Sequence, residues 1–238
     1  MTLVVFDFDH TIIDANSDIE INKLFPSKET LAKALQQVNG YKSWTTRMQS
    51  MFELLKFHEI TEDDYRKVMT EIPLTDGFVS LIQYLHALPN TELIIASDSN
   101  QVFIEMILKH HNLIEKFKRI FTNPAHFDTD QQYLQIQPLG QETCPSCPSN
   151  MCKREIIENY RKTLQIDDLK VLFIGDGHND VCAAKSLKKC DLVCARGGYR
   201  MADELSKWCN DEKNQLQTTL FEWTNGDEIK KFVHEKWL

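Results

Sequence analysis

The feature of this sequence that most constrains its fold is the alternation of short apolar runs with helical patterns. The runs contain few polar residues, as is typical of strands buried on both faces. They are Leu3–Phe6, Leu93–Ala96, Arg119–Phe121, Val171–Ile174, Asp191–Cys194 and Thr219–Phe221. Helical spacing of apolar residues recurs between and after them, at 77–88, 100–115, 152–165, 179–188, 198–210 and 226–237. Strands that alternate with helices predict an α/β fold with a doubly wound parallel sheet.

One long segment interrupts this alternation after the first run. Across residues 16–72 the apolar residues recur at helical spacing with no strand-like run, which predicts three or four inserted helices. We expect this segment to form a small helical cap domain, and residues 1–15 and 73–238 to form the α/β core. The alternative is that the extra helices pack into the main core.

Two connecting segments are rich in residues that break regular structure. Pro73–Gly77 is expected to lead back from the inserted helices, with Thr75 or Asp76 as the N-cap of the next helix. Residues 123–151 contain four prolines and a glycine. This stretch predicts a small hairpin and a loop that carries cysteines.

Composition and charge argue against several classes of partner. The chain of 238 residues has 27 Lys and Arg against 35 Asp and Glu, a formal charge of −8 that disfavours nucleic acids and anionic lipid surfaces. No apolar run reaches the ~18 residues of a membrane span, and the N-terminus resembles neither a secretory signal nor a transit peptide. The seven cysteines, an odd number, suit reduced thiols. We expect a cytoplasmic protein that acts on a small molecule.

Polar side chains gather at the ends of the predicted strands, where open α/β sheets bind ligands. Asp7–Thr11 follows the first strand, Ser97–Asn100 the second and Gly175–Asp180 the fourth, while Lys153 begins the helix before the fourth strand. Any one of these residues alone is more often a turn, a helix cap or a solvated charge. The three segments and Lys153 occur together in this order, each next to a predicted strand, which favours one site that they share.

Several carboxylates in one crevice repel one another unless a cation lies among them. Oxygen ligands of this kind select a hard divalent ion such as Mg²⁺. The metal and a lysine can neutralise the oxygens of a phosphoryl group while a carboxylate attacks in line. The sequence therefore predicts Mg²⁺-dependent phosphoryl transfer from a small phosphate ester.

The four motifs resemble those of the haloacid dehalogenase superfamily. They are DFDHT at Asp7–Thr11, Ser97, Lys153 and GDGHND at Gly175–Asp180, and the resemblance implies a Rossmann-like core with a helical cap after the first motif. Other stretches are similar to the eukaryotic phosphoethanolamine/phosphocholine phosphatases and their pyridoxal phosphate phosphatase relatives. These stretches are Thr11–Asp14, Asn16–Asp18, Ser97–Asn100, Phe121–Pro124, Cys144–Pro148, Asn150–Lys153 and Arg196–Tyr199. The similarity covers nearly the whole chain and implies a phosphatase.

The resemblance also implies the catalytic roles. Asp7 would be the nucleophile that forms an aspartyl-phosphate, which water then hydrolyses. Asp9 would protonate the leaving oxygen and later deprotonate the water. Ser97 would hydrogen-bond a phosphoryl oxygen, and Lys153 would pair with the nucleophile and the phosphate.

The same resemblance implies the metal site. Mg²⁺ would lie between Asp7, the backbone carbonyl of Asp9 and the carboxylate of Asp176. Asn179 or Asp180 would hydrogen-bond around this site or orient the lysine.

Asp18 and Asp98 are acidic residues that phosphate binding does not require. A carboxylate near a phosphate dianion is unfavourable unless a positive group lies between them, and an ammonium group on the substrate would be such a group. The alternative is that each residue caps the helix that starts near it. Both interpretations stay open at this point.

Cys144, Cys147 and Cys152 form a C-x2-C-x4-C pattern. The pattern is compatible with buried free thiols, with a redox pair, or with a structural zinc site whose fourth ligand is not apparent, although His126 lies upstream. Because Lys153 follows Cys152 directly, any constraint on this loop would also position the lysine.

Two other functions use the same acidic cluster. A phosphotransferase or mutase would form the same aspartyl-phosphate and pass the phosphoryl group to an organic acceptor. A non-catalytic phospho-acceptor signalling domain would be phosphorylated on Asp7, but it would need neither a cap nor an acid at Asp9.

Overall fold

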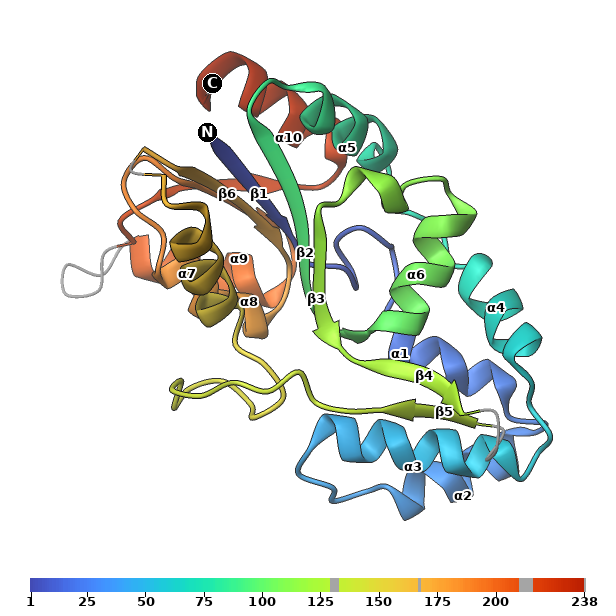
Figure 1. Ribbon diagram of the computed structural model, residues 1–238. Helices are drawn as coiled ribbons and strands as arrows, with labels where there is room; N and C mark the ends of the chain where they lie inside the picture. Colours follow the sequence, from blue (N-terminus) through green and yellow to red (C-terminus); the bar gives the residue numbers. More distant parts are fainter. Residues whose placement is uncertain (129–132, 167, 210–215, 238) are drawn as a thin grey trace.

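A six-stranded parallel sheet lies at the centre of the protein (Figure 1). The computed structural model describes residues 1–128, 133–166, 168–209 and 216–237. The strand order is β3-β2-β1-β6-β7-β8. These strands are β1 Thr2–Phe6, β2 Thr91–Asn100, β3 Arg119–Asn123, β6 Lys170–Gly175, β7 Leu192–Arg196 and β8 Thr219–Trp223. All neighbours pair in parallel, and each overlaps one of the predicted strands, which confirms the predicted α/β fold.

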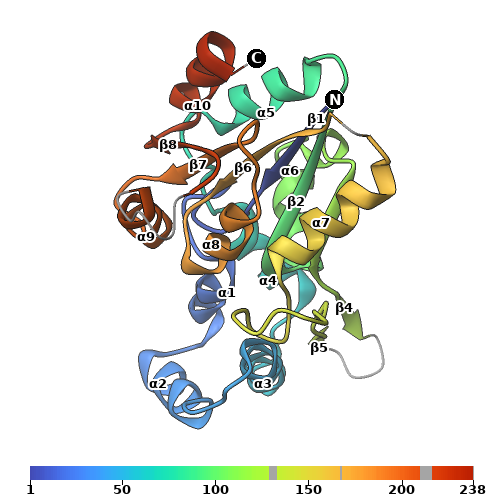
Figure 2. The ribbon, with the colours of Figure 1, turned by 90° about the vertical axis from the view of Figure 1, so that its left-hand side faces the viewer.

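Helices cover both faces of this sheet (Figure 2). Within β1, Val4 and Phe6 pack against one helical layer, whereas Leu3 and Val5 pack against the other, because successive side chains of a strand point to opposite faces. The first layer holds α5 Phe78–Ala87, α6 Gln101–His110 and α10 Gly226–Phe232; the second holds α7 Lys153–Leu164, α8 His178–Lys185 and α9 Arg200–Cys209. Burial on both faces explains why the strand sequences are apolar runs without alternation.

The predicted helices differ from the observed ones mainly at their ends. The pattern over 100–115 divides into α6 and a short 3-10 helix, η2, at Ile114–Lys116. The pattern over 226–237 divides into α10 and a π-helical turn, η3, at Val233–Trp237. Position 210, the last residue of the helix predicted over 198–210, lies outside the described residues. None of the described helices is both long enough and apolar enough to cross a membrane.

The inserted helices and a hairpin lie beyond the carboxyl ends of β1 and β2, away from the chain termini (Figure 1). The inserted elements are α1 Ser17–Glu20, η1 Ile21–Leu24, α2 Lys28–Gln37, α3 Trp44–Lys56 and α4 Glu62–Thr70. The predicted hairpin is also present, as the antiparallel pair β4 Ala125–Asp128 and β5 Tyr133–Ile136. Side chains of Ser27, Ser43 and Thr61 cap α2, α3 and α4, which explains where these helices begin.

Aromatic rings join the inserted helices to the rest of the protein. Phe52 of α3 packs edge-on against Phe103 of α6, with ring centroids 5.9 Å apart. Tyr65 of α4 stacks on the same Phe103 at 6.1 Å and meets Phe127 of the hairpin at 5.5 Å. All but Phe127 are buried in one hydrophobic cluster with Phe6 of β1. The division into a cap domain and a core therefore stays a prediction.

The expected cap at the start of α5 is wrong. Gly77, not Thr75 or Asp76, is the N-cap residue, and no side chain caps the helix. Gly77 has a left-handed φ of 75°, and a Cβ added there would lie 2.7 Å from the backbone nitrogen of Asp227. The close approach of α10 thus decides this turn, since only glycine combines that φ with that contact.

The second strand is longer than its apolar run. β2 continues through Ser97–Asn100, which the sequence placed after the strand, and its pairing with β3 shifts between Ala96 and Asn100. The buried Asn123 amide donates to the carbonyl oxygens of Asp98, at 2.7 Å, and Ser99, at 2.9 Å. These hydrogen bonds fix the polar end of β2 at the edge where the predicted site lies.

Candidate active site

The predicted site lies where the order of the strands reverses, between β1 and β6. Asp7 directly follows β1, and its backbone N–H donates to Ile174 of β6 at 2.9 Å. Asp176 directly follows β6. Because this reversal opens a crevice at the carboxyl ends of the strands, ligands bind there in open α/β sheets.

A cavity of about 270 Å³ occupies this crevice. Five carboxylates line it, and no lysine or arginine of the described chain does. The carboxylates belong to Asp7, Asp9, Asp18, Asp98 and Asp176. Trp44 of α3 and Asn179 of α8 also line it, so the inserted helices and the core both contribute walls. A cavity of this size and charge suits a small ligand that brings a cation with it.

Lys153 joins the first and last acidic motifs. Its Nζ lies 2.6 Å from Asp7 Oδ1 and 2.6 Å from Asp180 Oδ1, and all three side chains are almost completely buried. Burial disfavours the ammonium, but the carboxylates of Asp180 and Asp7 outweigh it and raise the pKa of Lys153. Asp180 Oδ2 also accepts the backbone N–H groups of Asp176, at 3.0 Å, and Gly177, at 2.9 Å. Asp180 therefore ties the lysine to the turn that carries Asp176.

The acidic cluster fits a divalent cation. Carboxylate oxygens of Asp7, Asp176 and Asp180 lie within 4.8 Å of one another. Burial and the charge of Asp180 raise the pKa of Asp7, and the same two causes raise the pKa of Asp176 to about 7. Lys153 alone thus leaves an excess of negative charge, which a hard cation such as Mg²⁺ would neutralise through oxygen ligands.

Asp9 is held by the first inserted helix. Its Oδ1 accepts the backbone N–H of Ser17, the first residue of α1, at 3.0 Å. Burial raises the pKa of Asp9 to about 7, against the hydrogen bonds from Ser17 that lower it. A carboxyl group with this pKa can both donate and accept a proton near neutral pH.

The capping interpretation is wrong for Asp18. Asn16, not Asp18, caps α1. Asp18 is buried, and its Oδ2 accepts the indole N–H of Trp44 at 2.6 Å. The carboxylate thus faces the cavity from the inserted helices.

The capping interpretation is also wrong for Asp98. Asn100 caps α6 through the N–H of Phe103. Asp98 Oδ1 accepts the side-chain amide of Asn179 at 3.2 Å. Asn179 therefore connects Asp98 of β2 to the motif after β6.

Ser97 stands apart from the other predicted residues. It is fully buried, and its hydroxyl accepts the backbone N–H of Ser99 at 3.3 Å. The residues that line the cavity do not include Ser97. This hydrogen bond does not use the hydroxyl proton of Ser97.

Sequence reasoning missed Trp44 and Ser17 as partners of the acidic residues. No pattern pairs Trp44 with Asp18, because 26 residues and two other helices separate them. Ser17 donates to Asp9 through its backbone N–H, which every residue but proline carries, so the residue type at this position gives no signal of the contact.

Sequence reasoning also missed Cys182, which lies on α8 beside Cys144, Cys147 and Cys152. His126, the candidate fourth ligand, lies exposed on β4 and outside this group. The sequence does contain a signal for Cys182. Lys153 was expected near the GDGHND motif, which ends at Asp180. Because Cys152 lies one residue before Lys153 and Cys182 two residues after Asp180, the two cysteines could be expected near each other.

Comparison with known proteins identifies the family. The family model described as "Putative Phosphatase" matches residues 2–237. The chain is 36% identical over 232 residues to "Probable phosphatase phospho2" of Xenopus tropicalis, covering 96% of this chain and 95% of the relative. It is 35% identical to "Pyridoxal phosphate phosphatase PHOSPHO2" of Bos taurus, covering 97% and 96%. It is 30% identical to "Phosphoethanolamine/phosphocholine phosphatase" of Gallus gallus, covering 98% and 88%.

Solved structures share the fold at low sequence identity. A haloacid dehalogenase family hydrolase of Salmonella enterica serovar Typhi, t0658, matches with a TM-score of 0.66 and 16% identity, over 100% of this chain and 72% of that one. A phospho-aspartyl intermediate analogue of phosphoserine phosphatase matches with a TM-score of 0.62 and 18% identity, over 97% of each chain. The solved structures show that the chain has the fold of haloacid dehalogenase family hydrolases. The family model and the relatives show that the chain is a phosphatase that belongs to the Putative Phosphatase family.

Proposed function

We propose that this phosphatase hydrolyses a small phosphate monoester with a cationic group, by way of an aspartyl-phosphate on Asp7. One observation carries the proposal. Buried Lys153 contacts Asp7 at the edge of the cavity, and two further carboxylates, Asp18 and Asp98, line the cavity and neither hold that lysine nor cap a helix. The first feature suits attack on phosphorus, and the second suits a positive group on the substrate.

In the first step, a carboxylate oxygen of Asp7 attacks the phosphorus in line with the ester oxygen. Lys153 would orient Asp7 and bind one phosphoryl oxygen, and the hydroxyl of Ser97 would donate a hydrogen bond to another. Asp7, the backbone carbonyl of Asp9 and Asp176 would hold Mg²⁺, which when bound neutralises charge on the phosphoryl oxygens. Asp180 keeps the lysine in place through its 2.6 Å contact.

Asp9 moves the protons of both steps. It donates a proton to the ester oxygen as the bond to phosphorus breaks. The same carboxylate then accepts a proton from the water that attacks the aspartyl-phosphate. Its raised pKa and its hydrogen bond to Ser17 suit both tasks.

Asp18 and Asp98 would recognise the substrate. The names of the relatives point to pyridoxal phosphate and to phosphoethanolamine or phosphocholine. Each of these molecules joins a phosphate to a nitrogen that carries or can gain a positive charge. Two carboxylates in a cavity of about 270 Å³ provide the matching charge.

A substrate panel tests the proposal. Pyridoxal 5′-phosphate, phosphoethanolamine, phosphocholine and glycerol 2-phosphate, an ester without a cationic group, are assayed with Mg²⁺, using the wild type and Asp7→Asn. We expect Asp7→Asn to lose at least about 10³-fold in kcat, because the nucleophile is gone. Retention of wild-type activity by Asp7→Asn would overturn the mechanism.

Charge recognition needs its own comparison. Asp18→Asn and Asp98→Asn keep the shape of each side chain but remove its charge. We expect kcat/KM to fall about 10-fold or more for the cationic substrates and little for glycerol 2-phosphate. Equal losses on both kinds of substrate would remove the recognition role.

The alternative functions give different products. A phosphotransferase would convert an added alcohol acceptor into a new phosphate ester, and we expect inorganic phosphate instead. A signalling domain would keep its phospho-aspartate for minutes without turnover, and we expect repeated turnover.

A further inference from the structure

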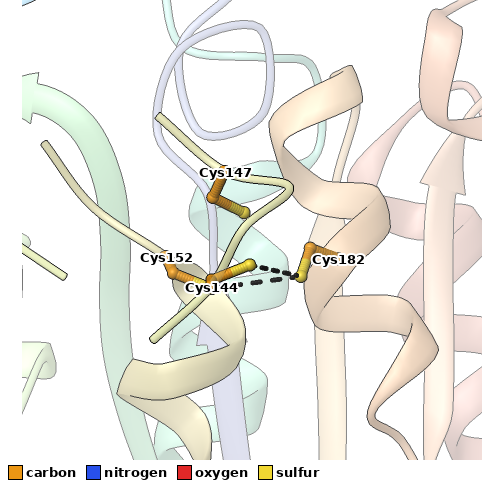
Figure 3. A group of neighbouring side chains, drawn as sticks. All are labelled: Cys144, Cys147, Cys152 and Cys182. Carbon is orange, nitrogen blue, oxygen red and sulfur yellow. Dashed lines mark hydrogen bonds between the residues drawn. The ribbon is translucent and has the colours of Figure 1, made fainter. Parts of the chain in front are cut away.

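Four cysteine side chains meet in one group (Figure 3). The group is separate from the cluster of Asp7, Asp176 and Asp180. Cys144, Cys147 and Cys152 come from the loop before α7, of which Cys152 is the N-cap residue, and Cys182 comes from α8. We propose that Cys144, Cys147, Cys152 and Cys182 hold one zinc ion in a closed, structural site. The ion would fasten the loop that precedes Lys153 to the helix that carries Asp180.

The distances between the sulfur atoms fit one tetrahedral ion. Four sulfurs at the usual Zn–S distance of ~2.3 Å stand about 3.8 Å from one another. The Sγ atom of Cys182 lies 3.7 Å from that of Cys144 and 3.9 Å from that of Cys152. All four sulfurs lie within 4.8 Å of one another. This spacing is nearly twice the ~2.05 Å of a disulfide bond, and all four cysteines are free.

The kind of ligand also selects the metal. Thiolates are soft ligands that bind zinc strongly, whereas Mg²⁺ and Ca²⁺ prefer oxygen. The group contains four sulfurs and no carboxylate or imidazole, so it differs chemically from the aspartate cluster. Four protein ligands complete a tetrahedron and leave no position for water, as in structural rather than catalytic zinc sites.

The surroundings favour the charge that such a site would have. One Zn²⁺ with four thiolates carries a net charge of about −2, since four negative ligands exceed the two charges of the ion. Arg154 and Lys185 line the same surface cavity as Cys144, Cys147 and Cys182. Glu158 and Glu204 line this cavity as well, and Glu158 lies 4.0 Å from Arg154, so the two cations would offset only part of the excess.

The loop itself lacks regular structure. No helix or strand is present from Gln137 to Cys152. Gln141 brackets Cys144, donating to its carbonyl at 2.9 Å and accepting its N–H at 2.8 Å. Glu155 of α7 accepts the N–H groups of Glu142, at 3.0 Å, and Thr143, at 2.8 Å. A long segment without helix or strand would gain order from a metal bound by three of its residues.

The zinc site would position the lysine of the active site. Cys152 is the residue before Lys153, and it makes no capping hydrogen bond with its side chain. Cys182 is two residues beyond Asp180, the partner of Lys153 at 2.6 Å. The ion would thus hold both halves of the Lys153–Asp180 pair. This positioning role rests on the proposed function, whereas the metal site itself does not.

Metal analysis tests the site directly. The full chain is produced without a polyhistidine tag, dialysed against metal-free buffer and analysed for zinc and iron. We expect one zinc per chain, together with release of that zinc when a mercurial reagent blocks the thiols. Absence of zinc after loading with one equivalent, one iron in its place, or a disulfide among the four cysteines would each overturn the proposal.

Variants locate the ion. Cys182→Ser should lose the zinc, and Cys182→His should keep it. Cys209→Ser, which changes an exposed cysteine outside the group, should bind zinc as the wild type does. Cobalt replaces zinc in a parallel sample, and we expect thiolate-to-cobalt charge-transfer bands that Cys182→Ser lacks. Undiminished zinc in Cys182→Ser would contradict the assignment. The mercurial titration of the wild type answers the same question if a variant does not fold.

The positioning role has a separate readout. We expect removal of zinc to weaken the binding of inorganic phosphate about 10-fold or more, and Cys182→His to restore it. A protein with one zinc but no phosphatase activity would leave the metal site standing and refute the proposed function. Phosphate binding that does not change when the zinc is removed would refute the positioning role.

Discussion

At the scale of single residues, the site is a set of carboxylates whose surroundings differ. Lys153 holds Asp7 at 2.6 Å, whereas Asp9 is held by the backbone of Ser17. Burial raises the pKa of both carboxyl groups, but only Asp7 touches the ammonium. The two residues therefore suit different tasks, a charged nucleophile and a group that exchanges protons.

Replacement of Asp9 by Asn separates the two chemical steps. With an alkyl phosphate, we expect kcat to fall about 10²- to 10⁴-fold, because the leaving oxygen receives no proton. With p-nitrophenyl phosphate, whose leaving group needs no proton, phosphorylation of Asp7 should persist while hydrolysis of the intermediate stalls. A rapid-quench experiment should show a burst of about one p-nitrophenol per site and a phosphorylated peptide that contains Asp7. Equal losses on both substrates, without a burst, would contradict the role of Asp9.

The same residue predicts a pH effect on the first step. An acid works in its protonated form, and the pKa of Asp9 is raised to about 7. We expect the rate of enzyme phosphorylation by an alkyl phosphate to fall as the pH rises through this value. With p-nitrophenyl phosphate the rate should stay level over the same range. Stopped-flow measurement of both substrates from pH 5.5 to 8.5 distinguishes this acid from an effect on binding.

At the scale of helices and strands, a cluster of aromatic rings packs the inserted segment against the rest of the protein. Tyr65 of α4 is 2% exposed and packs against Phe103 and Phe127. Its hydroxyl has no hydrogen-bond partner among the described residues. A buried hydroxyl without a partner lowers stability.

Removal of that hydroxyl should therefore stabilise the protein. We expect Tyr65→Phe to raise the free energy of unfolding by roughly 1 kcal/mol, because the ring packing stays and the unpaired group goes. Tyr41→Phe, at a position that is 44% exposed, is the matched control and should change stability by less than about 0.5 kcal/mol. Urea unfolding measures both. A clear loss of stability in Tyr65→Phe would show that the hydroxyl has a partner.

Local sequence predicts elements well where burial sets the pattern. Leu3–Phe6 reads as a strand because all its residues are buried between two helical layers. Ser97–Asn100 does not read as a strand, because its extended form depends on hydrogen bonds from the distant Asn123. The start of α5 at Gly77 depends on contact with α10, almost 150 residues later. Such features arise from packing, which a local pattern does not contain.

The candidate site divides in the same way. Asp7, Asp9, Lys153 and Asp176 could be predicted to lie near one another because each stands beside a predicted strand or helix end, and parallel strands bring such ends together. Trp44 was not found, since its contact with Asp18 depends on how α3 packs across the crevice. Cys182 was not found, although it lies two residues after Asp180, because its place beside the loop also depends on how α7 packs against α8.

At the scale of the whole molecule, the buried acidic cluster links stability to pH and to Mg²⁺. Folding raises the pKa of Asp9 and Asp176 to about 7 from an ordinary value of 3.8. The folded protein therefore binds more protons than the unfolded chain between these values. The stabilisation from protonation is complete below the unfolded pKa and is lost as the pH rises through about 7.

We accordingly expect the protein in Mg²⁺-free buffer to be less stable at pH 8 than at pH 6, by on the order of 1 kcal/mol. Mg²⁺ should raise stability more at pH 8, because it replaces the lost protons in neutralising the cluster. Urea unfolding at both pH values, with and without Mg²⁺, measures the effect. Asp176→Asn should reduce the pH dependence and the response to Mg²⁺ together. A stability that rises from pH 6 to pH 8 and ignores Mg²⁺ would contradict this reading of the cluster.

The central claim is that the phosphoryl group is displaced twice, first by Asp7 and then by water. The stereochemical course at phosphorus tests this claim most directly. The substrate is a thiophosphate ester whose phosphorus is chiral because it carries one sulfur and two different oxygen isotopes. It is hydrolysed in water that contains a third oxygen isotope. Each in-line displacement inverts the configuration at phosphorus. Two displacements therefore give net retention, which we expect in the released thiophosphate. Net inversion would show a single displacement by water and would contradict the account.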